Sequence, residues 1–97
     1  MKKLILSLAL LLPLSAHAEQ SNCQGVSSLA RVIMESRQTG VNIIDVINAV
    51  DDNELAKVII IEAYKDPKFS TDDYKKTSIN EFASRWYIIC LKEKEED

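Results

Sequence analysis

The two cysteines constrain this chain most strongly, because they are its only ones and lie near opposite ends of the part expected to fold. Cys23 and Cys90 are far too distant in sequence for a C-x-x-C redox motif, in which a basic group usually sits beside closely spaced thiols. In an oxidising compartment an even pair of cysteines most simply forms one disulfide. We therefore expect a Cys23–Cys90 bond that closes nearly the whole domain into one loop.

The amino terminus has the three parts of a cleavable secretion signal. Two lysines, Lys2 and Lys3, come before an apolar stretch over residues 4–14. An A-x-A cleavage site then ends at Ala18. This order is typical of a signal peptide, so we expect residues 1–18 to be removed on export.

Two alternatives to a free exported domain are weaker. The apolar stretch is much shorter than the roughly 20 residues of a membrane-spanning helix, which argues against a retained anchor. A lipoprotein needs a cysteine directly after the cleavage site, whereas Cys23 lies inside the mature chain, which would begin at Glu19. We expect residues 19–97 to work in the periplasm or outside the cell, as one domain.

Cleavage makes the protein more acidic. The full chain has 12 Lys and Arg against 15 Asp and Glu, and the loss of Lys2 and Lys3 changes its net charge from −3 to −5. Such a surface repels phosphate groups, and no basic stripe with interleaved aromatic residues occurs. These features argue against nucleic acid and against an anionic membrane surface as partners.

The signal also contains His17, the only histidine of the chain. The mature protein therefore lacks an imidazole for a Ser-His-Asp or Cys-His site, and a zinc site would need carboxylates and the two cysteines. The acidic run 51–54 lacks the alternating ligands and the glycine of a calcium loop, so helix capping is the favoured interpretation. A carboxylate pair for glycoside hydrolysis stays open, although nothing marks two acids as a pair. We expect no catalytic residue, metal or cofactor.

Apolar residues recur at helical spacing after Cys23, which predicts a helix over about residues 24–39. The apolar positions are Val26, Leu29, Ala30, Ile33 and Met34. We expect Arg31, Glu35 and Gln38 on the opposite face. Gly40 then predicts the end of this helix.

Three more helices follow from capping signals. Asn42 is expected to cap a short helix to about Val50, and Asp51 or Asp52 to cap a third that ends before Pro67. The β-branched run 58–61 leaves a strand as the alternative for part of the third helix.

A long fourth helix is predicted by a capping box of Ser70 and Asp73, with Phe69 and Tyr74 as a hydrophobic staple. We expect the acidic end, residues 92–97, to fray. The fold class is all-α: a small bundle of about four helices linked by one disulfide.

Five residues form a candidate partner-binding surface, because aromatic and arginine side chains are enriched in binding hot spots. They are Arg37, Tyr64, Arg85, Trp86 and Tyr87. The alternative is that Trp86 anchors the core while Tyr87 is half exposed. Residues 86–91 are apolar all round the helix, so they should be buried on several sides or form an interface.

Several stretches together resemble a group of small secreted proteins encoded by phages and prophages of Gram-negative bacteria. The resemblance covers nearly all the mature chain and is carried by residues 32–40, residues 63–67, Phe82, Trp86-Tyr87 and Cys90. It implies origin and secretion, and it provides no catalytic residues. In architecture alone, the chain is similar to the HdeA-type acid-stress chaperones of the periplasm.

Three functions remain open at this point. The first is a non-enzymatic interaction protein, such as an inhibitor or immunity-type factor, with an unknown protein partner. The second is an acid-stress chaperone that opens when paired carboxylates are protonated. The third is a small hydrolase that acts through two carboxylates across a cleft. The sequence gives no oligomeric state.

Overall fold

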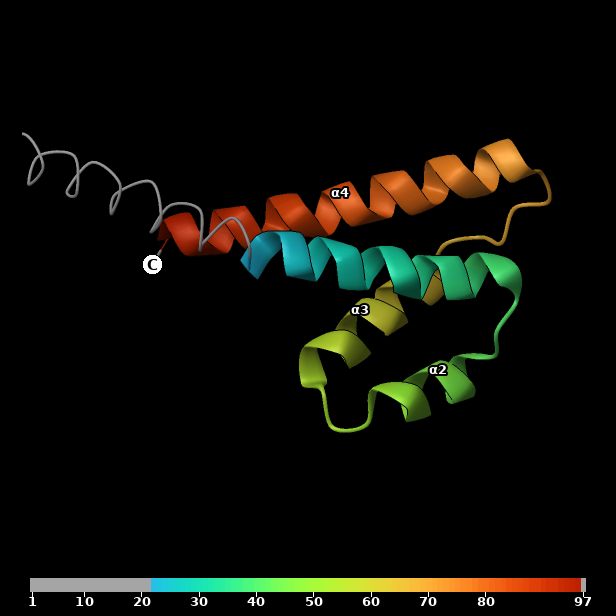
Figure 1. Ribbon diagram of the computed structural model, residues 1–97, viewed down its shortest axis with the longest axis horizontal. Coiled ribbons are helices and arrows are strands. Elements are labelled where there is room, and N and C mark those ends of the chain that lie inside the picture. Colours follow the sequence, from blue (N-terminus) through green and yellow to red (C-terminus); the bar gives the residue numbers. More distant parts are fainter. Residues whose placement is uncertain (1–21, 97) are drawn as a thin grey trace, which may run out of the picture.

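The computed structural model describes residues 22–96, and this part of the chain is all-helical (Figure 1). The first helix spans residues 22–39 and is called the 22–39 helix below. It is followed by α2 (Ile43–Val50), α3 (Glu54–Lys65) and α4 (Asp72–Glu96). The predicted all-α bundle is confirmed, and the described residues contain no strand. The run 58–61 lies inside α3.

The two ends of the chain can be compared with the predicted domain boundaries. The predicted signal, residues 1–18, lies outside the described residues. From residue 22 to residue 96, no helix is long and apolar enough to cross a membrane. The acidic end 92–97 is helical through Glu96. Fraying is a motion, and it stays a prediction.

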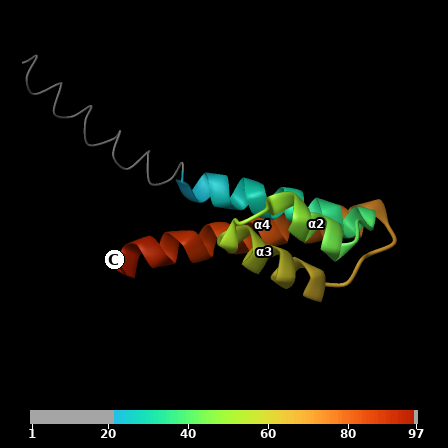
Figure 2. The same cartoon turned by 90° about the horizontal axis from the view of Figure 1, so that it is seen from below.

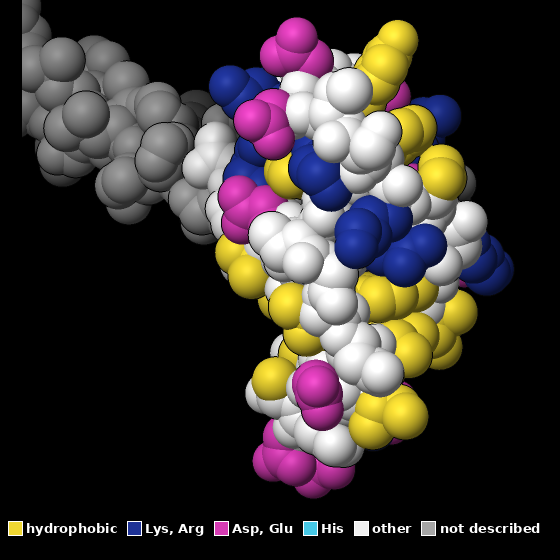
Figure 3. Space-filling view, turned by 90° about the vertical axis from the view of Figure 1, so that its right-hand side faces the viewer, with side chains coloured by type: hydrophobic (Ala, Val, Ile, Leu, Met, Phe, Trp, Pro, Cys, Tyr) yellow, Lys and Arg dark blue, Asp and Glu magenta, His cyan; other side chains and the backbone are white. Residues whose placement is uncertain are grey.

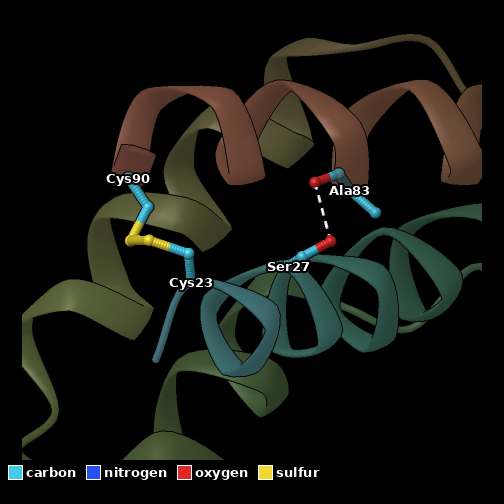
Figure 4. Close-up of a disulfide and its surroundings, with 4 residues drawn as sticks. All are labelled: Cys23, Ser27, Ala83 and Cys90. Carbon is cyan, nitrogen blue, oxygen red and sulfur yellow. Dashed lines mark hydrogen bonds between the residues drawn. A yellow bond between two sulfur atoms is a disulfide. The ribbon is translucent and has the colours of Figure 1, made fainter. Parts of the chain in front are cut away.

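The 22–39 helix and α4 lie side by side and run in opposite directions (Figures 1 and 2). The predicted disulfide is confirmed: Cys23 at the start of one helix is bonded to Cys90 near the end of the other, with 5.5 Å between the Cα atoms. Further along the pair, the Ser27 hydroxyl donates a 2.9 Å hydrogen bond to the Ala83 carbonyl (Figure 4). The two helices are thus fixed in register at two points.

The hydrophobic core forms where α2 and α3 pack on one side of this helix pair (Figure 1). Its largest fully buried apolar side chains come from three helices and are Phe82, Met34, Ile59 and Ile60. Trp86 lies at the edge of the core and is 9 % exposed. Burial of one such large side chain contributes about 1.5–3 kcal/mol, so this cluster is the main source of stability.

Gly40 ends the 22–39 helix, as predicted. Its φ is 90°, a left-handed conformation in which a side chain would be strained. Two backbone hydrogen bonds complete a Schellman motif, from the Gly40 amide to the Arg37 carbonyl at 3.1 Å and from the Val41 amide to the Ser36 carbonyl at 2.9 Å.

The N-cap of α2 is the predicted one, whereas those of α3 and α4 lie one residue or more further along. The Asn42 side chain accepts a hydrogen bond from the Ile44 amide at 2.8 Å. Asn53 caps α3 instead of Asp51 or Asp52, because the turn that leaves α2 uses both aspartates. Within the run 51–54, the side-chain oxygen of Asn53 therefore caps a helix, which agrees with the favoured interpretation.

The fourth helix is capped by Thr71 instead of the predicted Ser70. The Thr71 hydroxyl accepts a 3.3 Å hydrogen bond from the Tyr74 amide, and its carbonyl accepts from Lys75. The start shifts because Gln38 holds the amide of Phe69 at 2.9 Å, which keeps that segment outside the helix. The predicted contact between Phe69 and Tyr74 is present, with ring centroids 5.9 Å apart.

The prediction that Gln38 lies on the solvent face of the 22–39 helix is wrong. The side chain is 1 % exposed, although the sequence pattern placed it with Arg31 and Glu35. Gln38 follows Met34 by four residues and Ala30 by eight, so it continues the buried stripe of the helix. Its amide is buried because it is hydrogen-bonded to the loop before α4.

The turn between α2 and α3 contains a backbone conformation that is unfavourable for its residue. Asp51 has φ 57° and ψ −120°, and the Asn53 amide bonds to the Val50 carbonyl at 3.1 Å. These angles match the first central position of a type II′ turn, which glycine prefers. Asp51 is exposed, so glycine would remove little contact there.

Replacement of Asp51 by glycine is expected to stabilise the protein. Glycine removes the steric strain of a positive φ, which stabilises the folded state by about 1–2 kcal/mol. The greater entropy of glycine in the unfolded chain offsets roughly 0.5–1 kcal/mol of this gain. Urea denaturation of Asp51→Gly should therefore show a free energy of unfolding about 0.5–1 kcal/mol higher. Asp52→Gly is the matched control, since Asp52 has no positive φ, and it should be destabilising. Equal effects of the two variants would contradict the turn assignment.

Candidate functional site

Two of the five predicted surface residues, Arg37 and Tyr64, lie together. The Arg37 guanidinium carbon is 5.2 Å from the centre of the Tyr64 ring, and its Nε donates a 3.0 Å hydrogen bond to the Asp66 carbonyl. The Tyr64 hydroxyl donates to the Val41 carbonyl at 2.6 Å. The pKa of Tyr64 is raised above its ordinary value, mainly because burial removes water from the hydroxyl. The Arg37 charge opposes this rise, and the Asp45 charge adds to it. Both side chains thus hold the segments that follow the 22–39 helix and α3.

Arg85 belongs to the same neighbourhood. Its guanidinium lies 5.6 Å from the centre of the Phe82 ring, and its Nη1 is 4.0 Å from the Asp66 carboxylate. Asp66 is therefore shared: its carbonyl accepts from Arg37, and its carboxylate faces Arg85. The Arg85 side chain is still about half exposed, which leaves it free to contact another molecule.

Trp86 and Tyr87 face different sides of α4. Trp86 is buried at the edge of the core, whereas Tyr87 is half-buried and Ile88 is exposed. Successive residues of a helix are rotated by about 100°, which accounts for this pattern. The five predicted residues therefore do not form one surface. Trp86 and Arg85 lie on the side of α4 that faces α3.

A groove runs between α3 and the last three turns of α4, and Trp86 forms its floor. It consists of two hollows of about 250 and 240 Å³ that share Trp86 and Ile89. We call it the α3/α4 groove; its apolar residues are Val26, Leu55, Val58, Trp86, Ile89 and Cys90. The charged residues at its two ends are Glu62 and Arg85, and Glu93 and Lys94.

The groove exists because α3 has more apolar residues than its buried side needs. Ala56, Ile59, Ile60 and Ala63 fill the core side of α3. Leu55 and Val58 lie on the flank towards α4 and remain 45 % and 50 % exposed. They face Ile89 of α4, which is 37 % exposed, across the two hollows. The result is a contiguous apolar surface with charged ends.

The sequence alone singles out Trp86 and the all-round apolar segment 86–91, but it does not reveal the α3 side of the groove. Leu55 and Val58 resemble ordinary helix residues, because only the packing of α3 shows which of its apolar residues are left over. One sequence feature does indicate the α3 side of the groove: α3 is apolar along nearly its whole length, whereas a helix with one buried face needs apolar residues on that face only.

A basic patch lies at the other end of the molecule. Lys and Arg side chains gather there, over the loops that join the helices (Figure 3). Lys75 Nζ donates a 2.6 Å hydrogen bond to the Gln38 carbonyl, and Lys68 Nζ lies beside Gly40. Cations are favoured at the carboxyl end of a helix, so these two lysines have a structural role at the end of the 22–39 helix.

Carboxylates in the described part of the chain are not grouped for metal binding: no three Asp, Glu, His or Cys residues there are placed to hold an ion. The two groove carboxylates, Glu62 and Glu93, belong to different hollows. What the groove offers is apolar contact area, an indole floor and a pair of opposite charges at each end. This chemistry suits the burial of an apolar helix face.

No protein-family model, curated protein or solved structure matches this chain.

Proposed function

We propose that this chain is an exported, non-enzymatic interaction protein that binds a protein partner through the α3/α4 groove. One observation carries the proposal: Leu55, Val58 and Ile89 form a contiguous exposed apolar surface over Trp86. Exposed apolar patches rimmed by polar residues mark interaction sites in monomeric proteins.

The composition of the groove supports binding. Tryptophan and arginine are the residues most enriched in binding hot spots, and Arg85 and Trp86 are adjacent in the groove. The disulfide fixes the end of the groove at Cys90, so little ordering is required when a partner binds. These features support an inhibitor or immunity-type factor that occupies another protein.

Export and origin belong to the same proposal. The predicted signal and the disulfide both suit a protein of the periplasm or the medium, where cysteines pair. The resemblance to small secreted phage and prophage proteins supports an origin in such an element. A factor of this kind would act on an enzyme, receptor or lysis component of the cell envelope.

An acid-stress chaperone remains the alternative, since exposed apolar side chains could also bind unfolded clients. That mechanism needs carboxylates whose ion pairs hold the folded state at neutral pH. The described residues contain two ion pairs, Glu62–Lys65 and Asp66–Arg85, whose side chains are 31–65 % exposed. Exposed pairs contribute about 0–1 kcal/mol each, which favours the interaction protein over an acid-opened chaperone.

A photo-crosslinking amino acid at Val58 tests the proposal in cells that export the protein. Val32 is the matched control, because it is a valine of similar exposure, 57 %, on the 22–39 helix and outside the groove. We expect position 58, and not position 32, to cross-link to one defined foreign protein. Failure of position 58 to do so would overturn a foreign partner at this site.

The purified partner then allows a direct measurement of affinity. Val58→Glu should weaken binding at least about tenfold, because the new carboxylate would be buried unpaired against Trp86. Val32→Glu should bind like the wild type. Melting curves of both variants show whether each is folded before affinities are compared.

A further inference from the structure

The side of α4 that borders the groove has a charge pattern that is complementary to itself. Arg85, Ile89 and Glu93 are spaced by four residues, so they lie in a row along one side of the helix. The cation and the anion stand at equal distances from Ile89, one turn before it and one turn after it. Among the described residues, Glu93 has no ion-pair partner.

This symmetry identifies what fits the groove. If a second α4 lies antiparallel along the first with the two Ile89 side chains in contact, each Arg85 faces Glu93 of the other copy. A two-fold axis repeats the pair, so both charges of each copy are matched. We propose that a second copy of this chain occupies the α3/α4 groove of the free protein, with its α4 antiparallel and centred on Ile89. This inference rests on the proposed function, because it uses the same binding surface.

The apolar surface matches the same arrangement. Val58 and Leu55 of α3 flank Ile89, so the two-fold axis brings these side chains of both copies together over the two Trp86 rings. No like charges on α4 face each other at positions 85 to 93.

The size of the surface and the charge of the protein predict a weak dimer. The matched part of α4 is two turns long, about 12 Å, which corresponds to an interface at the low end of specific complexes. Each copy is acidic, which opposes association at low salt. A dissociation constant on the order of 10–100 µM is expected, so that a tighter foreign partner can displace the second copy.

Charge reversal tests the register and leaves the apolar residues Leu55, Val58 and Ile89 in place. Sedimentation equilibrium of the purified exported domain, from about 1 µM to 500 µM, should show a monomer that becomes a dimer. Arg85→Glu alone and Glu93→Arg alone should stay monomeric over this range, since each places two like charges in contact twice. The double variant, Arg85→Glu with Glu93→Arg, should dimerise like the wild type.

A mixture of the two single variants provides the decisive measurement. One variant is acidic at both positions, 85 and 93, and the other is basic at both, so neither forms a homodimer. In the mixture each acidic position faces a basic one, so a heterodimer should appear only there.

Two outcomes would overturn the inference: a wild type that is still monomeric at about 500 µM, or a mixture that stays monomeric while the wild type dimerises. These results do not depend on a foreign partner. If the protein dimerises but position 58 does not cross-link to a foreign protein, only the proposed function is refuted. If position 58 cross-links to a foreign protein but the free protein stays monomeric, only this inference is refuted.

Discussion

Reduction of the Cys23–Cys90 disulfide is expected to lower the melting temperature of the protein by roughly 15–30 °C. The bond joins residues 67 positions apart, which encloses most of the folded chain in one loop. In the chain-entropy model, a loop of this length contributes about 4 kcal/mol by restricting the unfolded state. Small domains have a net stability of only about 5–15 kcal/mol, so this one bond is a large share of it.

Thermal melts with and without a reducing agent measure this effect. The double variant Cys23→Ala with Cys90→Ala separates loss of the bond from other actions of the reagent, because its melting temperature should already be low and should not respond. The bond joins the start of the 22–39 helix to α4 (Figure 4). Loss of structure should begin there, so the nearby groove is expected to lose its shape first. A melting temperature that is unchanged by reduction would contradict the stabilising role.

The helices could be predicted because their signals are local. The spacing of Val26 to Met34 and the glycine after Thr39 determine a helix and its end through bonds that span only a few residues. Asn42 caps α2 for the same reason. The disulfide was also predictable, because two cysteines allow a single pairing within the chain.

The starts of α3 and α4 could not be predicted to the residue, because each depends on how the segment before it is folded. Asn53 becomes the cap of α3 only because Asp51 and Asp52 turn back from α2. Thr71 becomes the cap of α4 because a side chain of the 22–39 helix binds the segment before it. For α4 the deciding contact comes from Gln38, 31 residues before Phe69 in the sequence. For α3 the deciding feature is the type of turn that residues 50–53 adopt.

The candidate site was predictable in part. An all-round apolar segment at residues 86–91 indicates extra contacts, and Trp86 does form the floor of the groove. Arg37 and Tyr64 were grouped with it because of their residue types, but the structure places them around Asp66 and Val41. Which residues of α3 remain exposed depends on how three helices pack, and no short-range pattern records that.

Loss of the Gln38 amide is expected to cost about 2–4 kcal/mol of folding free energy. Gln38 Nε2 donates to the Pro67 carbonyl at 2.9 Å, and its Oε1 accepts from the Phe69 amide at 2.9 Å. Methionine has a similar size but no such groups, so Gln38→Met leaves two backbone groups of the loop unpaired, at about 1–2 kcal/mol each. Gln24→Met is the matched control on the same helix; Gln24 is exposed, and its replacement should change stability by less than about 0.5 kcal/mol.

A second variant separates the hydrogen bonds of Gln38 from the volume that it fills. In Gln38→Glu a protonated carboxyl can still donate to Pro67 and accept from Phe69, whereas a carboxylate cannot donate and is costly to bury. The folded state should therefore raise the pKa of the introduced carboxyl above its usual value of about 4.3. Below about pH 4.3 the carboxyl is protonated in both states, so the variant should approach the stability of the wild type. The difference in free energy of unfolding between the two proteins should grow as pH rises through the raised pKa. Urea denaturation of both proteins between about pH 3.5 and 7 measures this difference, and a constant difference would show that Gln38 acts by packing alone.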